Sequence, residues 1–173
     1  NAGAVWTGPS WTRTVIQLTA FGSSGYFDWG LAWDVNDQGI AVGLVSRASD
    51  YVQFAYVYDM KRGVGQLLPM PSGYVESNPY AISNVVDGVV YVAGVLRPCS
   101  NHSCRDNRGV RWTVDVGQIG QSGYQPAYEV LSQLAWAEGA SDQGFIAGTK
   151  NSTPDRRGNI IQTAMLWKPA GYI

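Results

Sequence analysis

The residue types most suited to chemistry gather in one predicted loop, which holds Cys99, His102 and Cys104. Two thiolates and an imidazole are good zinc ligands, but a structural zinc needs a fourth ligand, and no neighbouring stretch repeats the pattern. The two cysteines can instead bond to each other across this short loop or stay as thiols. Because His102 is the only histidine, most schemes that pair a nucleophile with an imidazole base are excluded.

Carboxylates are the second set of candidate catalytic groups. The residues considered for paired acid chemistry are Asp28, Asp34, Asp50, Glu76, Glu129 and Glu138. Glycoside hydrolysis needs two carboxyl groups about 5–10 Å apart across a cleft. The sequence does not place any two of them at that separation, and carboxylates in loops are usually solvated. We therefore predict a protein that is not an enzyme and that has no cofactor.

The acidic segment Asp34-Val35-Asn36-Asp37-Gln38-Gly39 resembles the start of a calcium loop. It lacks an oxygen ligand at the fifth position, and no glutamate stands at the twelfth. A tight turn explains the segment better, because Gly39 supplies a positive φ and Asn or Asp side chains bond back to turn amides. We predict a hairpin here and no metal.

Two tripeptides fit the Asn-x-Ser/Thr acceptor pattern for N-glycosylation, at Asn101 and at Asn151. Both fall in predicted loops, where such sites are accessible. Because these tripeptides are common by chance, both residues are candidate modification sites only.

The hairpin at Gly39 belongs to a pattern that occurs three times. Each copy has two short apolar segments around a polar turn and closes with a glycine, and an aromatic residue follows in the next segment. The closing glycines are Gly43, Gly94 and Gly148, spaced 51 and 54 residues apart. The aromatic residues are Tyr58, Trp112 and Trp167, spaced 54 and 55 residues apart. Such regular spacing is typical of blades or repeat arrays.

This pattern resembles the HAF-type extracellular repeat, whose copies read roughly Ala-x-x-Ile-Asn-x-x-Gly-x-Val-Val-Gly, a variable loop, then Ala-Phe-x-Trp. The pairs Ile82-Ser83 and Ala140-Ser141 depart from the Ile-Asn form. The resemblance covers nearly all of the chain. It implies an exported, β-propeller-like protein and transfers no active-site residue. Export favours a disulfide between Cys99 and Cys104 over the zinc and thiol alternatives.

We predict an all-β fold with three propeller-like repeats of about four antiparallel strands and incomplete terminal blades. The units are a partial blade (1–25), repeat 1 (26–70), repeat 2 (71–134) and repeat 3 (135–173), which lacks its last strand. We expect a strand over Thr14–Leu18 and a linker over Pro69–Asn78. Residues 124–134 fit either a strand or a short helix, and the repeat register favours the strand.

Aromatic residues divide into recurring and non-recurring sets. The recurring ones, Tyr58, Trp112 and Trp167, are expected in the core. The non-recurring ones are candidates for stacking against a sugar ring or a partner's side chain. They are Trp29, Trp33, Tyr74, Tyr124 and Trp136.

Charge and hydropathy exclude two classes of partner. Twelve basic and thirteen acidic residues give a formal net charge of −1, and the basic residues are scattered. Nucleic acid and anionic membrane surfaces are therefore not expected as partners. No apolar run approaches the roughly 18 residues of a membrane span.

The predicted role is a non-catalytic, extracellular structural or self-assembling protein whose terminal strands complete a neighbouring copy. The alternatives are a glycan- or protein-binding module and, less favoured, an enzyme that acts on polysaccharide. Because the chain begins with Asn1 rather than Met, we expect a removed signal peptide, a cut from a longer protein or a chosen boundary.

Overall fold

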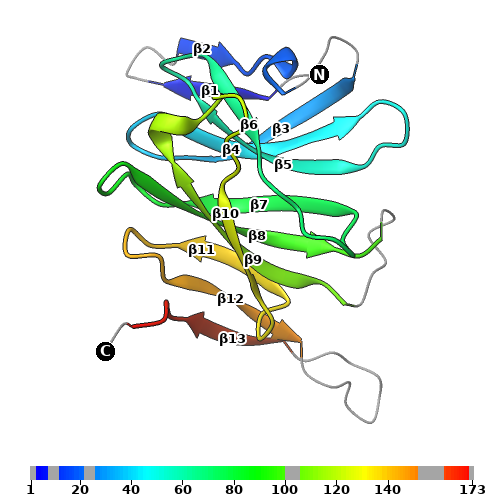
Figure 1. The fold of residues 1–173 in the computed structure, drawn as a ribbon, viewed down its shortest axis with the longest axis vertical. Helices are drawn as coiled ribbons and strands as arrows, with labels where there is room; N and C mark the ends of the chain where they lie inside the picture. Colours follow the sequence, from blue (N-terminus) through cyan, green and yellow to red (C-terminus); the bar gives the residue numbers. More distant parts are fainter. Residues whose placement is uncertain (1–2, 8–11, 22–25, 100–105, 152–161, 172–173) are drawn as a thin grey trace.

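The computed structural model describes residues 3–7, 12–21, 26–99, 106–151 and 162–171. These residues form an all-β structure of four antiparallel sheets. Figure 1 shows the sheets following one another from the N-terminal end to the C-terminal end, so that β1 and β13 lie at opposite ends of the molecule. Within the described residues the sheets do not close into a ring.

Each sheet is a meander in which strands adjacent in sequence are adjacent in space. The first sheet contains β1 (Ala4–Thr7) and β2 (Thr12–Val15). The second contains β3 (Phe27–Val35), β4 (Ile40–Arg47), β5 (Gln53–Asp59) and β6 (Val64–Leu67). The third contains β7 (Glu76–Ile82), β8 (Val89–Arg97), β9 (Arg108–Asp115) and β10 (Ala127–Leu131). The fourth contains β11 (Trp136–Ala140), β12 (Ile146–Asn151) and β13 (Gln162–Trp167).

Neighbouring sheets pack face to face, and three clusters of apolar residues lie between them. The largest cluster joins the second and third sheets around Trp112, whose side chain is fully buried. The Trp112 indole Nε1 donates a hydrogen bond to the carbonyl of Pro69 at 2.8 Å. Because β4 and β8 lie inside sheets covered on both faces, they are almost continuously apolar rather than alternating.

The three closing glycines permit a close approach that no other residue would allow. A Cβ on Gly43 would lie 1.9 Å from the carbonyl oxygen of Leu31. The equivalent distances are 2.3 Å from Gly94 to Asn78 O and 2.0 Å from Gly148 to Trp136 O. Each glycine faces a β-bulge in the first strand of its sheet. The bulge and the glycine are therefore two parts of one contact.

The turns after these first strands also share a polar design. Asn36 Oδ1 accepts from the Ile40 amide at 2.9 Å, and Ser83 Oγ accepts from the Tyr91 amide at 2.9 Å. Ser141 Oγ accepts from the Phe145 amide at 3.1 Å. Gly39 has a φ of +82°, so the predicted positive φ at this hairpin is confirmed.

The acidic segment 34–39 does more than form its own turn. Asn36 Nδ2 donates to the carbonyl of Ser83 at 2.9 Å, and Asp34 Oδ2 accepts from the Ile82 amide at 2.9 Å. Asp142 Oδ1 repeats this on the next sheet by accepting from the Asn84 amide at 2.8 Å. Hydrogen bonds between turns thus join the second, third and fourth sheets at one end of the strands.

Two strand boundaries differ from the sequence prediction. The expected linker over Pro69–Asn78 is wrong at its end, because β7 begins at Glu76 and continues through Pro79. Proline is tolerated there because β7 is an edge strand and Pro79 adjoins its bulge. The expected strand over Thr14–Leu18 is replaced by β2, which ends at Val15, and by the 3₁₀ turn η1 (Leu18–Ala20).

The ambiguity over residues 124–134 is resolved in favour of a strand. β10 pairs with β9 over five residues, from Ala127 opposite Thr113 to Leu131 opposite Gly109. The apolar residues at helical spacing instead divide between the strand and the turn that follows it. The described helices are η1 and η2 (Val116–Gln118), both 3₁₀ turns of three residues.

The bond between sheets at Asn36 can be tested separately from its turn. Asn36→Asp keeps an oxygen for the turn amides but removes the donor to Ser83 and places a carboxylate oxygen against that carbonyl. We expect a loss of about 1–3 kcal/mol in the free energy of unfolding, measured by urea denaturation. Asp37→Asn, at an exposed position of the same turn, should change it by less than about 0.5 kcal/mol. Equal stability of the two variants would contradict the assignment.

Candidate binding site

Three of the β-bulges lie opposite the closing glycines, whereas a fourth, in β3, skips Asp28. The residue that each of these three bulges leaves outside the pairing register is Trp33 in β3, Tyr80 in β7 or Glu138 in β11. Each stands three positions before the turn residue of its own hairpin. A bulge leaves its extra residue outside the ladder and re-aims its side chain. Trp33 is 50% exposed, Glu138 is exposed and Tyr80 is half-buried.

Three aromatic rings from three different sheets form a continuous surface, which we call the aromatic row: Trp33, Tyr80 and Trp136. The centroids of Trp33 and Tyr80 are 6.1 Å apart, with their planes at 63°. The centroids of Tyr80 and Trp136 are also 6.1 Å apart, with planes at 43°. These separations lie within the favourable range for aromatic pairs. The first strands β3, β7 and β11 therefore bring distant residues into one row.

A hollow lies at each end of the aromatic row. The Glu138 hollow has a volume of about 420 Å³ and is lined by Tyr80, Trp136, Glu138 and Gln162. The Asp34 hollow has a volume of about 270 Å³ and is lined by Ala4, Val5, Ala32, Trp33, Asp34 and Val35. Among their described lining residues, the Asp34 hollow combines one aromatic ring with one carboxylate, and the Glu138 hollow combines two aromatic rings with one carboxylate and one amide.

Arg97 packs against the Trp136 ring of the aromatic row. Its guanidinium carbon lies 5.5 Å from the centroid of the Trp136 ring, within the range of a cation–π contact. Arg97 Nη1 is 3.6 Å from Glu76 Oε2, and both side chains are nearly buried. In the orientation that satisfies its neighbours, the Asn78 amide oxygen accepts from Arg97 Nη1 at 3.0 Å. The arginine therefore holds Trp136 in a fixed position.

The environment of Tyr80 keeps its hydroxyl protonated at neutral pH. Burial is the largest cause that raises the pKa of Tyr80 above its ordinary value, and the nearby Glu138 carboxylate acts in the same direction. Arg97 and a hydrogen bond with Asn78 oppose the rise without cancelling it. The row thus presents a neutral phenol between two indoles.

Of the five aromatics predicted to face a ligand, Trp33 and Trp136 lie in the row. Trp29 is half-buried on β3. Tyr74 and Tyr124 are partly buried against the core between the second and third sheets, and the Tyr124 hydroxyl accepts from the Asp115 amide at 2.7 Å. The structure therefore does not bring the five together.

Sequence reasoning missed Tyr80. A signal for it was available, because Trp33 precedes Asn36 by three positions just as Tyr80 precedes Ser83. Of the aromatics expected in the core, Tyr58 and Trp112 are buried. Trp167 is half-buried, with the Arg111 guanidinium 4.6 Å from its ring centroid.

The six carboxylates considered for catalysis are spread over several elements. Glu76 faces Arg97, and Glu129 is 3.2 Å from Arg111. Asp34 accepts from backbone amides, and hydrogen bonding with Arg47 holds the pKa of Asp50 below its ordinary value. Asp28 lies on β3 and Glu138 on β11. Within the described residues, no group of three or more His, Cys, Asp or Glu is placed to hold a metal ion.

Most residues of the predicted disulfide, zinc and glycosylation sites lie outside the described residues. Asn101, His102 and Cys104 belong to the range 100–105, which the structure does not describe. The disulfide with Cys99 and the glycosylation of Asn101 therefore stay predictions. Asn151 is the last residue of β12 rather than part of a loop, and the rest of its acceptor tripeptide is not described.

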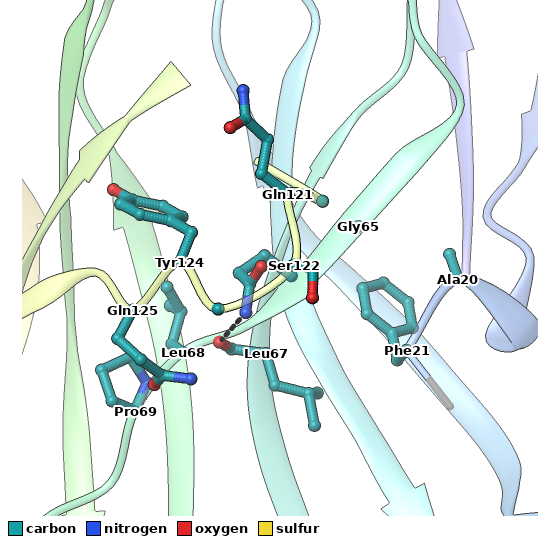
Figure 2. Close-up of a pocket in the computed structure, with 13 residues that line it drawn as sticks. Ala20, Phe21, Gly65, Leu67, Leu68, Pro69, Gln121, Ser122, Tyr124 and Gln125 are labelled. Atoms are coloured by element: carbon teal, nitrogen blue, oxygen red, sulfur yellow. Dashed lines mark hydrogen bonds between the residues drawn. The ribbon is translucent and has the colours of Figure 1, made fainter. Parts of the chain in front are cut away.

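A third hollow, of about 410 Å³, lies between β6 and the segment that precedes β10. Figure 2 shows Phe21 at one side and Tyr124 at the other, with Ser122 between them. Gln66 Nε2 donates to the Leu67 carbonyl at 3.4 Å. The Phe21 ring packs against the core, because its centroid lies 4.6 Å from the centroid of the Tyr56 ring and the ring covers Gly65. Among its described lining residues this hollow has neither a charged side chain nor a tryptophan, so the aromatic row is the better candidate for specific binding.

Comparisons of this chain with protein-family models, with curated proteins and with solved structures found no match. The resemblance to the HAF-type repeat therefore stays a prediction. In the part of the chain that the structure describes, no helix has the length and apolar character required to cross a membrane.

The support of the row by Arg97 predicts a specific pattern of stability. Arg97→Met should lower the free energy of unfolding by about 3–5 kcal/mol, because it leaves the Glu76 carboxylate in the interior without its cation. The double variant Arg97→Met/Glu76→Gln should recover most of this loss in urea denaturation. Arg47→Met, which breaks the exposed ion pair with Asp50, should cost no more than about 1 kcal/mol. A double variant no more stable than Arg97→Met would contradict the pairing.

Proposed function

We propose that this chain is a non-catalytic module that binds a glycan along the aromatic row. The observation that carries the proposal is the alignment of Trp33, Tyr80 and Trp136 on one surface, with a hollow at each end. The C–H faces of sugar rings are apolar and stack on aromatic rings, whereas their hydroxyls bond to carboxylates and amides. Binding sites commonly combine apolar walls with a few polar groups in this way.

The arrangement of polar groups supports binding rather than hydrolysis. Hydrolysis needs two carboxyl groups on opposite sides of one bond. Among the described residues that line the Glu138 hollow, one carries a carboxylate. Glu76, which lies beneath the row, is 1% exposed and faces Arg97 rather than solvent.

The proposal includes the repeat architecture and the extracellular location inferred from the sequence. The second, third and fourth sheets each contain a bulge, a closing glycine and a polar turn, and these shared features support the proposal of three propeller-like repeats. An exported protein that binds glycans would meet its ligand on a cell surface or in an extracellular matrix. The proposed Cys99–Cys104 disulfide is compatible with that location.

The glycan proposal is tested by affinity electrophoresis against a panel of soluble polysaccharides. Trp33→Ala and Trp136→Ala should each weaken retention by the best ligand about five- to tenfold, because each removes one stacking face. Tyr128→Ala is the matched control, since Tyr128 is 44% exposed but lies on β10. Retention unaffected by either tryptophan variant, or retention by no polysaccharide, would contradict the proposal.

A second candidate function is self-association by strand addition. Among the described strands β13 pairs with β12 alone, so no described strand covers its other edge, and Leu166 on β13 is 62% exposed. An open apolar edge is a template for another strand. A second copy of this chain would supply that strand.

Light scattering tests this second candidate. We expect a mass that is a multiple of 18.7 kDa at high protein concentration. Leu166→Lys should reduce it to the monomer, because lysine on an edge opposes strand pairing. Val86→Lys, at a position that is 44% exposed in the connection between β7 and β8, should leave the assembly intact. A wild-type protein that is strictly monomeric at all concentrations rules out this function.

A further inference from the structure

We propose that the glycan held on the aromatic row carries free amino groups, which pair with the carboxylates of the two hollows. This inference rests on the proposed function and adds the chemical class of the ligand. Its basis is the charge around the row. Each hollow contains one acidic residue beside an aromatic ring, Glu138 beside Trp136 and Asp34 beside Trp33.

The charge of these carboxylates is not offset by the described residues beside them. Among the described residues that line the two hollows there is neither a lysine nor an arginine. Arg97 lies beneath Trp136, but it is 8% exposed and faces the buried carboxylate of Glu76. In the part of the chain that the structure describes, a ligand on the row therefore meets two carboxylates and no lysine or arginine that lines its hollows.

The two carboxylates differ in how they are held. Asp34 is fixed, because its oxygens accept from the amides of Val35 and Ile82, each at 2.9 Å. Its carboxylate lies in the lining of the Asp34 hollow. Glu138 is exposed, and the structure describes no ion pair between it and another described residue. The Glu138 carboxylate interacts electrostatically with the row, since it contributes to the raised pKa of the Tyr80 hydroxyl.

This charge pattern discriminates among glycans. A sugar with carboxylate or sulfate groups is repelled by both hollows. A neutral or N-acetylated sugar stacks on the rings but gains no ionic contact. A protonated amino sugar gains both, and an exposed ion pair with Glu138 is expected to tighten binding about two- to fivefold.

The experiment is isothermal titration of the full chain with three hexasaccharides in mildly acidic, low-salt buffer. The probes are a glucosamine oligomer, its N-acetylated counterpart and an oligogalacturonate. We expect the glucosamine oligomer to bind about two- to fivefold more tightly than the N-acetylated oligomer, and the galacturonate to bind most weakly. The preference should shrink as added salt screens the charges or as a higher pH deprotonates the amines.

Glu138→Gln should lower the affinity for the amino sugar more than the affinity for the N-acetylated oligomer, so that the preference between the two shrinks. Glu129→Gln is the control, because Glu129 is a half-exposed glutamate paired with Arg111 on another part of the surface. A preference that survives Glu138→Gln would overturn the inference. So would equal or tighter binding of the N-acetylated oligomer or of the galacturonate.

Two outcomes concern the nature of the ligand itself. If none of the three hexasaccharides binds, the proposed function fails and this inference fails with it, whereas equal binding of all three overturns the inference alone. A lysine hexapeptide tests whether charge suffices without a sugar. If it competes as strongly as the glucosamine oligomer, the surface recognises cations rather than amino sugars, and the inference is overturned.

Discussion

The contact between a glycine and a carbonyl group from the neighbouring strand is the constraint on which this structure depends. At Gly43, Gly94 and Gly148 the first strand of a sheet lies too close for any side chain on the second strand. The first strand bulges opposite each glycine, and the bulge turns one residue outward. The backbone feature that builds each sheet therefore also creates the candidate binding site.

Burial of both faces is the second condition, and it explains why the sheets occur in a row. The central strands β4 and β8 are apolar on both sides, so the second and third sheets each need a neighbouring sheet on both faces. Apolar clusters between the sheets provide most of this cover, whereas polar turns fix the alignment of one sheet with the next. Asn36 is one such polar group, because it closes its own turn and also bonds to the Ser83 carbonyl of the next sheet.

Local features of the fold could be predicted from the sequence, whereas contacts between sheets could not. The all-β class, the positive φ at Gly39 and the burial of Trp112 follow from spacing and turn chemistry. Pro79 misled the prediction because its tolerance depends on lying at an edge and beside a bulge. Two members of the aromatic row were named from the sequence, but Tyr80 required alignment of the turns. The pairing of Arg97 with Glu76 left no signal, since it forms between separate strands.

The residue at the bulge position can be exchanged without a change in the pairing of the strands. Because Trp33, Tyr80 and Glu138 stand outside the ladder, their side chains are not required for strand pairing. An indole, a phenol and a carboxylate already occupy this one position in three sheets. Evolution can therefore exchange the residue there and alter the proposed binding surface while the glycine, the turn and the core stay constant. A protein engineer has the same freedom, with three adjacent positions to vary on an unaltered scaffold.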